Sequence, residues 1–163
     1  MTKIEMFHSW LNDAYAMEMT KNDLLKRYAK DFEDYPDIKM NIEKVSSKAV
    51  EKADRLKSII ENMGEKVSMM KSFTGKLTGM WQSATSELTH DQIVKHLLVM
   101  YSGANLGIAS YLSLAAAAKE LGRDEVANFA NDSITETREF VQWLEDRIPE
   151  VTIEFLQKEH TNQ

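Results

Sequence analysis

The chain has 163 residues, which is enough for one domain with a sizeable hydrophobic core and gives no reason to expect a second. It contains no cysteine, so disulfides, thiolate metal sites and cysteine nucleophiles are excluded, and any metal would need carboxylate or imidazole ligands. The net charge of -6 and the pI near 5.3 argue against a nucleic-acid binder, because a phosphate backbone attracts basic surfaces.

The composition is typical of a helical protein. Leu, Ala, Met, Glu and Lys are common, and proline occurs only at Pro36 and Pro149. The first ten residues contain Glu5 and His8 and no apolar run, so we expect no secretory signal. No segment is expected to reach the roughly 18 apolar residues of a membrane span. These features predict an all-α cytoplasmic protein without membrane or nucleic-acid partners.

Two long helices are predicted in the first part of the chain. The first runs from about Lys3 to Asp31 and ends before Pro36, because the residue before a proline avoids helical geometry. The second begins near Asp37 and ends at Gly64, a usual residue at a helix stop. Their apolar residues recur at steps of three and four, as in Ile4, Phe7, Leu11, Ala14, Leu25, Tyr28 and Phe32, then Ile38, Ile42, Val45, Ala49, Ala53, Leu56, Ile60 and Met63.

The pattern weakens between residues 64 and 88, where short helical pieces carry clustered Met and Trp side chains. Thr89 and Gln92 fit a capping box that opens a third helix, which closes at Gly122. A fourth helix is expected from about Asp124 until Pro149 stops it, and a short amphipathic C-terminal helix follows.

Four helices of about 25 to 30 residues, at 1.5 Å per residue, predict a four-helix bundle as a single domain over residues 1–163. Short turns after the first and third helices make each pair antiparallel, whereas the long segment between the second and third lets those two run parallel. The expected fold class is therefore an all-α, ferritin-like four-helix bundle with one long crossover between helices two and three.

Glu18 lies where the apolar stripe of the first helix should continue. A carboxylate turned toward a core needs a metal, a cation or a shared proton, because an unpaired buried charge is very costly. The alternative is a carboxylate at the edge of the stripe, solvated or paired with Lys21 one turn along the helix.

Glu136 has the corresponding place in the stripe of the fourth helix, so Glu18 and Glu136 are the two candidate metal ligands. Di-metal sites in ferritin-like bundles use about four carboxylates and two histidines, and two carboxylates fall well short of that set. Asp132 and Glu139 lie close to Glu136 in sequence, so an edge position for Glu136 is the alternative.

Several motifs resemble the YciE/YciF-type bacterial stress-response proteins, which have a ferritin-like fold. They keep the order and approximate spacing of that family over nearly the whole chain. The motifs are Ile4-Glu5, His8 to Leu11, Asp13 to Glu18, Tyr35-Pro36-Asp37, Ile42-Glu43, Tyr101, Ile108 to Ala117, Trp143-Leu144 and Ile148-Pro149.

The departures from the family pattern fall on the metal site. The family has an acidic residue followed by Thr where this chain has Lys48 and Ala49. A family segment resembling Phe-Glu-x-Phe-Glu-Ile is replaced here by residues 103–108, with neither glutamate present. The second of two paired glutamates on the fourth helix is Thr137. We therefore hypothesise that Lys48 balances Glu18 and Glu136 in place of a metal, so that Lys48→Met should destabilise the fold.

The resemblance implies a stress-associated protein with a degenerate, metal-free di-iron site and a structural or protein-interaction role. Neither catalysis nor a cofactor is expected, and a homodimer is implied, with the Met-rich crossover as the candidate contact. The alternative is weak iron binding by Glu18 and Glu136, and a protein partner is a further possibility. The pairs Glu5–His8 and Glu87–His90 have metal-ligand spacing outside the central layer, and His96 and His160 are expected at the surface.

Overall fold

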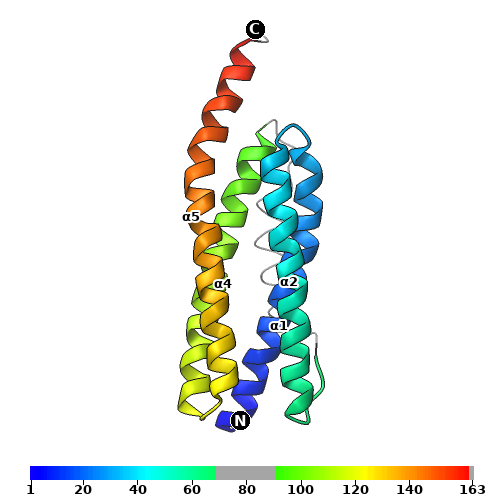
Figure 1. The fold of residues 1–163 in the computed structure, drawn as a ribbon, viewed down its shortest axis with the longest axis vertical. Coiled ribbons are helices and arrows are strands. Elements are labelled where there is room, and N and C mark those ends of the chain that lie inside the picture. The colour runs from blue at the N-terminus through cyan, green and yellow to red at the C-terminus, as the bar shows by residue number, and fades with distance from the viewer. Residues whose placement is uncertain (69–90, 162–163) are drawn as a thin grey trace.

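The structure is a computed structural model that describes residues 1–68 and 91–161 (Figure 1). In these residues the chain is all α-helical and contains no strand. The elements are α1 (Lys3–Ala29), the short 3-10 turn η1 (Lys30–Phe32), α2 (Pro36–Asn62), α4 (Gln92–Glu120) and α5 (Asp124–Thr161).

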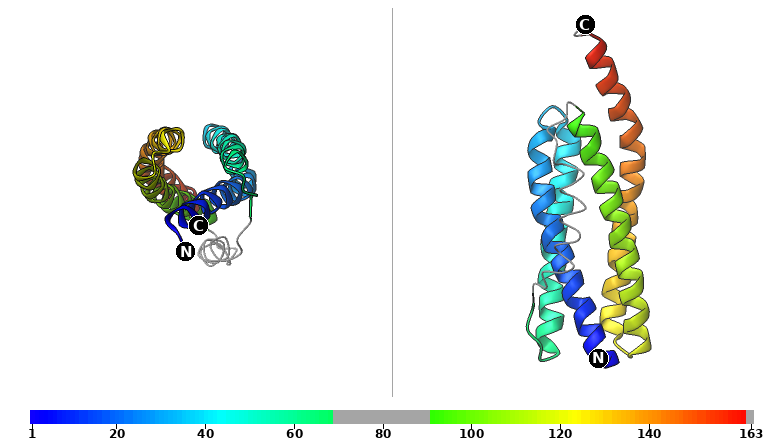
Figure 2. Two further views of the ribbon diagram at one scale, coloured as in Figure 1. Left: turned by 90° about the horizontal axis from the view of Figure 1, so that it is seen from below. Right: turned by 180° about the vertical axis from the view of Figure 1, so that it is seen from behind.

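The four long helices lie along a common axis but do not close into a full ring. Figure 1 shows α1 and α5 running in one direction and α2 and α4 in the other, so α2 and α4 are parallel, as the loop lengths predict. Seen along the axis in Figure 2, the order is α5, α4, α1, α2. The main contacts are α1 with α2, α4 with α5 and, less extensively, α1 with α4. The side between α2 and α5 is therefore open.

The helix ends follow from local sequence. Thr2 and Glu5 form a reciprocal capping box at the start of α1, with the Thr2 hydroxyl accepting from the Glu5 amide and Glu5 accepting from the Thr2 amide. Pro36 is the first residue of α2, where its missing N–H costs nothing. Gly64 and Gly122 follow α2 and α4 with φ of 79° and 63°, a conformation that glycine adopts without strain.

The prediction that Pro149 stops the fourth helix is wrong. Helix α5 continues through Pro149 to Thr161, so there is no separate C-terminal helix. A proline inside a helix removes one backbone hydrogen bond, a loss that tertiary contacts can offset. Here Val151, two residues after the proline, is buried, and Lys158 lies over the Tyr35 ring with its Nζ 4.8 Å from the ring centroid. The part of α5 beyond the proline thus keeps contacts with the rest of the chain.

The predicted start of the third helix also needs correction. Helix α4 begins at Gln92, so Gln92 is not the third residue of a capping box. Asp91 takes the cap position, but its carboxylate makes no capping hydrogen bond and instead lies 3.1 Å from the ammonium of Lys95 one turn later. Thr89, the pair Glu87–His90 and the short helical pieces expected between residues 69 and 88 lie outside the described residues.

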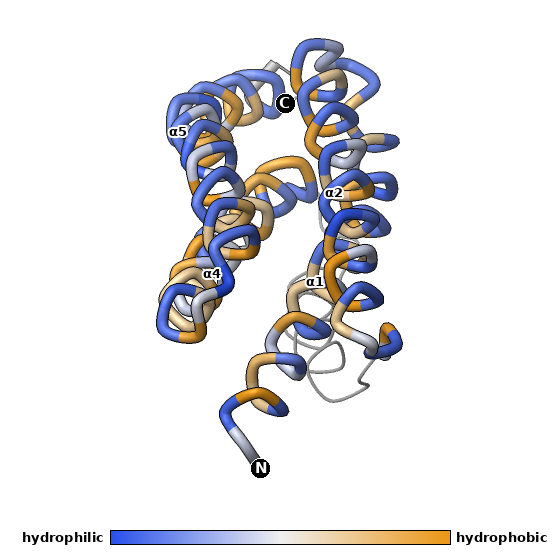
Figure 3. Tube along the Cα trace, turned by 60° about the horizontal axis from the view of Figure 1, so that its bottom comes forward, coloured by the Kyte–Doolittle hydropathy of each residue, from blue (hydrophilic) through white to orange (hydrophobic). Residues whose placement is uncertain are grey.

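The hydrophobic core lies along the contacts of α1 with α2 and α4 and of α4 with α5. Most of the predicted stripe residues are buried, although Ile4 is 40% exposed. Figure 3 shows that α4 is mostly apolar, whereas hydrophilic residues dominate the outer face of α2. The position of α4 between α1 and α5 accounts for part of this composition, but Leu98 and Leu112 on α4 are each 48% exposed.

Helix α4 is long and apolar enough to cross a membrane, the one such helix in the part of the chain that the structure describes. Its best window has a mean hydropathy of 1.3 and is 33% buried. The expectation that no segment reaches this level is therefore wrong. By itself this is weak evidence for a membrane span, because the central helix of a bundle meets the same criterion.

His96 is buried rather than at the surface, contrary to the sequence expectation. Its ring stacks on Tyr28 at a centroid distance of 3.7 Å and an interplanar angle of 8°. Burial lowers the pKa of His96 from 6.5 to about 4, although the Asp31 carboxylate, 3.6 Å from Nδ1, opposes the shift. The neutral imidazole is thus part of the core between α1 and α4.

We expect His96 to make the fold sensitive to acid. An unfolded chain binds this proton near pH 6.5 and the folded chain only near pH 4, so the unfolded state holds more protons between these values. The free energy of unfolding should fall across that window by on the order of 3 kcal/mol. Urea denaturation of His96→Phe, which keeps a stacked ring but cannot be protonated, should show a shallower pH dependence than the wild type.

The matched control for this experiment is His8→Phe, because His8 is a partly exposed histidine on α1 beside Glu65. This variant should keep the fall in unfolding free energy between pH 6.5 and pH 4, because it leaves His96 unchanged. An equal loss of pH dependence in both variants would contradict the assignment to His96.

Candidate functional site

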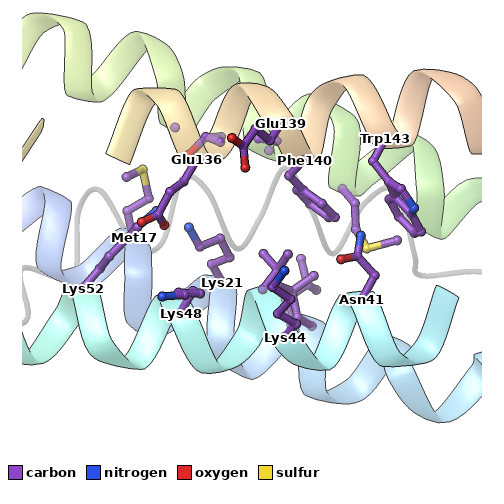
Figure 4. Close-up of a pocket in the computed structure, with 18 of the residues that line it drawn as sticks. Met17, Lys21, Asn41, Lys44, Lys48, Lys52, Glu136, Glu139, Phe140 and Trp143 are labelled. Atoms are coloured by element: carbon purple, nitrogen blue, oxygen red, sulfur yellow. The ribbon is translucent and has the colours of Figure 1, made fainter. Parts of the chain in front are cut away.

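A cleft of about 430 Å³ opens between α2 and α5, at the level of the predicted metal layer. All four long helices contribute to its walls. Figure 4 shows Lys21, Lys48, Lys52 and Glu136 towards one end of the cleft, and Asn41 and Trp143 towards the other. The lining also includes Met17, Leu24, Leu25, Lys44, Val45, Val99, Met100, Gly103, Ala104, Gly107, Tyr111, Thr137, Glu139 and Phe140.

Glu18 lies in the core behind this cleft. Its side chain is 0% exposed, and the Tyr111 hydroxyl donates a hydrogen bond of 2.7 Å to Glu18 Oε1. Burial raises the pKa of the Tyr111 phenol well above its usual value, and the Glu18 charge raises it further, while a hydrogen bond with Ser133 opposes the shift. Tyr111 therefore stays protonated and acts as a permanent donor from α4 to the carboxylate on α1.

Lys21 provides the cation for Glu18. Its Nζ lies 2.6 Å from Glu18 Oε2, one turn along α1. The approach lacks hydrogen-bond alignment, so Oε2 has no aligned donor among the described residues and is held by charge. The local alternative named from the sequence is therefore the observed one, although Glu18 itself is fully buried rather than at an edge.

Lys48 does not reach Glu18 as hypothesised. Its Nζ lies 3.2 Å from Glu51 on the same helix, and its side chain is 48% exposed. The hydrogen bond with Glu51 is the main reason that the pKa of Lys48 is raised, with a smaller contribution from Glu136 across the cleft. Lys48 thus lines the rim of the cleft, where its ammonium remains in contact with water.

Glu136 lies at the edge of the cleft, not in the core. Its side chain is 46% exposed, and its Oε2 lies 3.3 Å from Nζ of Lys52 on α2. Ser133, Thr137 and Phe140 form the buried side of α5 instead. The edge alternative for Glu136 is the one observed.

Lys52 is the charged residue that sequence reasoning missed. Its side chain is only 11% exposed. Burial is the main reason that the pKa of Lys52 is lowered; Lys21 lowers it further, and the charges of Glu18 and Glu136 offset part of the effect. The helical spacing does indicate that Lys52 is buried. Lys52 follows Ala49 by three residues on the apolar stripe of α2, just as Glu18 follows Ala14 by four on α1.

The positions where the family pattern has glutamates face the same cleft. Ala104, Gly107 and Thr137 are buried and line it. A Cβ added to Gly107 would meet no atom within 4 Å, so the missing side chain leaves open space. The hydroxyl of Thr137 donates to the backbone carbonyl of Ser133 at 2.7 Å, one turn earlier on α5. None of these three side chains offers a carboxylate.

The donor set does not fit a di-iron centre. Among the side chains of residues 1–68 and 91–159, no three from His, Asp or Glu gather closely enough to hold a metal. Glu18 has one oxygen bound to Tyr111 and the other beside Lys21, while Glu136 lies beside Lys52. Glu5 caps its own helix, and His8 lies 3.3 Å from Glu65. Cations occupy the places where metal charge would be needed.

Ion pairs also bridge the open side of the bundle. Besides Lys52 with Glu136, α2 and α5 are joined by Arg55 with Glu125 at 2.7 Å and by Asp37 with Arg147 at 3.1 Å. These pairs are spread along the length of α2. Charge therefore holds together two helices that share few close backbone contacts.

The pairing of Glu18 with Lys21 predicts that Lys21 contributes far more to stability than Lys48 does. Lys21→Met leaves a buried carboxylate without its cation, and we expect the free energy of unfolding to fall by about 3 kcal/mol or more. The double variant Glu18→Gln/Lys21→Met removes both charges and should recover much of that loss. Chemical denaturation followed by circular dichroism measures all of these changes.

Lys48→Met serves as the matched control, because it removes the same charge from the rim of the same cleft. We expect its midpoint of denaturation to stay at the wild-type value, since exposed ion pairs contribute little. Comparable destabilisation by Lys48→Met and Lys21→Met would refute the assignment of Lys21 as the balancing cation.

The chain matches one protein family in sequence and several solved structures in fold. Residues 2–157 match the family described as a domain of unknown function (DUF892). A protein (XCC3681) from Xanthomonas campestris pv. campestris is 25% identical, with a TM-score of 0.82 over 97% of this chain and 98% of that chain. YcfI from Rhodopseudomonas palustris is 19% identical, with a TM-score of 0.77 over 89% and 94% of the two chains. The E. coli stress protein YciF is 18% identical, with a TM-score of 0.78 over 96% and 98%. The family match covers nearly the whole chain, and the chain therefore belongs to the DUF892 family, the YciE/YciF type that its motifs indicate.

Proposed function

We propose that this chain is a ferritin-like, stress-associated protein with a structural or protein-interaction role, in which lysine ammonium groups have replaced the metal of a di-iron centre. The likeness to the E. coli stress protein YciF supports the association with stress, and the parallel course of α2 and α4 supports the ferritin-like topology. The proposal includes no catalytic step.

The observation that carries this proposal is the environment of Glu18. One carboxylate oxygen accepts from Tyr111, and the other lies 2.6 Å from the ammonium of Lys21. A metal cation at this carboxylate would meet a positive charge held at the same oxygen, and Lys52 adds a second positive charge to the layer. The protein thus balances Glu18 with its own side chains.

Weak metal binding is the second candidate function. It is favoured by Glu18 Oε2, which has no aligned hydrogen-bond donor among the described residues, and by the position of Glu136 on the cleft wall. A metal there would have to displace Lys21 and obtain its remaining ligands from water. We rank it below the structural role because one buried carboxylate is far from a complete ligand set.

A cytoplasmic location, a homodimer and a protein partner are further parts of the proposal. They rest on the family resemblance and on the acidic, cysteine-free composition. Size-exclusion chromatography with light scattering tests the dimer directly.

Iron analysis tests the proposed loss of the metal. The full chain, purified without chelator and titrated anaerobically with ferrous iron, should bind less than one equivalent, because Lys21 occupies the carboxylate. Glu18→Gln is the control, and it should behave as the wild type does. Stoichiometric iron in the wild type that is lost in Glu18→Gln would overturn the proposal and establish the metal-binding alternative.

A further inference from the structure

The cleft between α2 and α5 combines an apolar interior with a cationic rim. Apolar side chains from α1 and α4, among them Leu24, Leu25 and Met100, form much of its wall. The rings of Phe140 and Trp143 on α5 stack at a centroid distance of 5.8 Å and an interplanar angle of 13° along one edge. A volume of about 430 Å³ is in the range of small-molecule sites.

Lysines outnumber glutamates among the residues that line the cleft. Four lysines lie there with two glutamates, Glu136 and Glu139. Lys21, Lys48 and Lys52 are engaged with Glu18, Glu51 and Glu136, whereas Lys44 has no ion pair among the described residues. Lys44 is therefore available at the mouth of an apolar cleft. Lys48, one turn along α2 and 48% exposed, can exchange Glu51 for an anionic ligand beside it.

From this juxtaposition we infer that the cleft is a binding site for a free aliphatic carboxylate of the fatty-acid class. The carboxylate lies between Lys44 and Lys48, and the alkyl chain runs into the space beside Gly107 and along Phe140. The tail supplies most of the affinity, because burying an alkyl chain removes apolar surface from water. The lysines select the sign of the head group, while Glu139 on the opposite wall opposes part of their attraction.

This site is independent of iron. The ligand enters the space that small residues leave open, while Glu18 stays buried behind Lys21. It therefore goes beyond the proposed structural role. Failure of the iron experiment and failure of the ligand experiment are distinguishable, because each uses its own probe.

Isothermal titration calorimetry with dodecanoate below its critical micelle concentration tests the inference. The wild type should bind about one equivalent with a negative heat-capacity change, the mark of apolar burial. Dodecyltrimethylammonium, with the same tail and a cationic head, and acetate, with the head alone, should bind far more weakly. Equal binding of both dodecyl compounds, or no uptake of dodecanoate, would overturn the proposal.

Two variants locate the ligand in the cleft. Lys44→Gln/Lys48→Gln should weaken dodecanoate binding by on the order of tenfold, since it removes both partners of the head group. Gly107→Leu should abolish binding by filling the cleft, and a Cβ at this position meets no atom within 4 Å, so the backbone itself accepts a side chain. Circular dichroism checks the fold, and the lysine variant alone carries the test should Gly107→Leu not fold.

Lys57→Gln/Lys119→Gln is the matched control, because it makes the same change in net charge at two exposed lysines outside the cleft. It should bind dodecanoate as the wild type does. Equal weakening by both double variants would show that only net charge matters and would overturn the site. Co-sedimentation with anionic phospholipid vesicles in the absence of dodecanoate uptake would likewise replace a free carboxylate by a lipid surface.

Discussion

The arrangement of the core depends on how the charge of one buried carboxylate is balanced. Glu18 on α1 takes a hydrogen bond from Tyr111 on α4 and a positive charge from Lys21 on its own helix. An uncompensated charge at this depth would cost several kcal/mol, so the two partners are fixed by the need to satisfy it. Because Tyr111 comes from a different helix pair, the same requirement sets the register of α1 against α4.

Small side chains explain why the cleft is open at its centre. Ala104, Gly107 and Thr137 line it without a carboxylate, and a Cβ added to Gly107 would meet no atom within 4 Å. The carboxylates of Glu18 and Glu136 lie beside Lys21 and Lys52, cations of the protein itself. The result is a partly apolar recess with lysines on its walls.

The helical fold could be predicted from sequence because it depends on local patterns. The steps of three and four place core residues correctly, and Gly64 and Gly122 end their helices as expected. Local patterns did not predict the continuation of α5 through Pro149 or the burial of His96. The ring of His96 stacks on Tyr28, a contact between residues far apart in the sequence. Periodicity indicated that Glu18 faces the core, with an edge position as the alternative, but the choice of Lys48 over Lys21 as its cation was wrong. That choice depends on the rotation of α2 about its axis, which places Lys52 inward and Lys48 at the rim.

The bundle consists of two helix pairs, α1/α2 and α4/α5, and is open between α2 and α5. The two pairs pack on each other through the buried contact of α1 with α4, whereas α2 and α5 meet through exposed ion pairs such as Arg55 with Glu125. Added salt does not weaken the apolar contact of α1 with α4. It does screen exposed charges, because the Debye length falls from about 8 Å at physiological ionic strength to about 3 Å in molar salt. Ionic strength therefore acts on the contacts between α2 and α5 and leaves the α1–α4 contact unchanged.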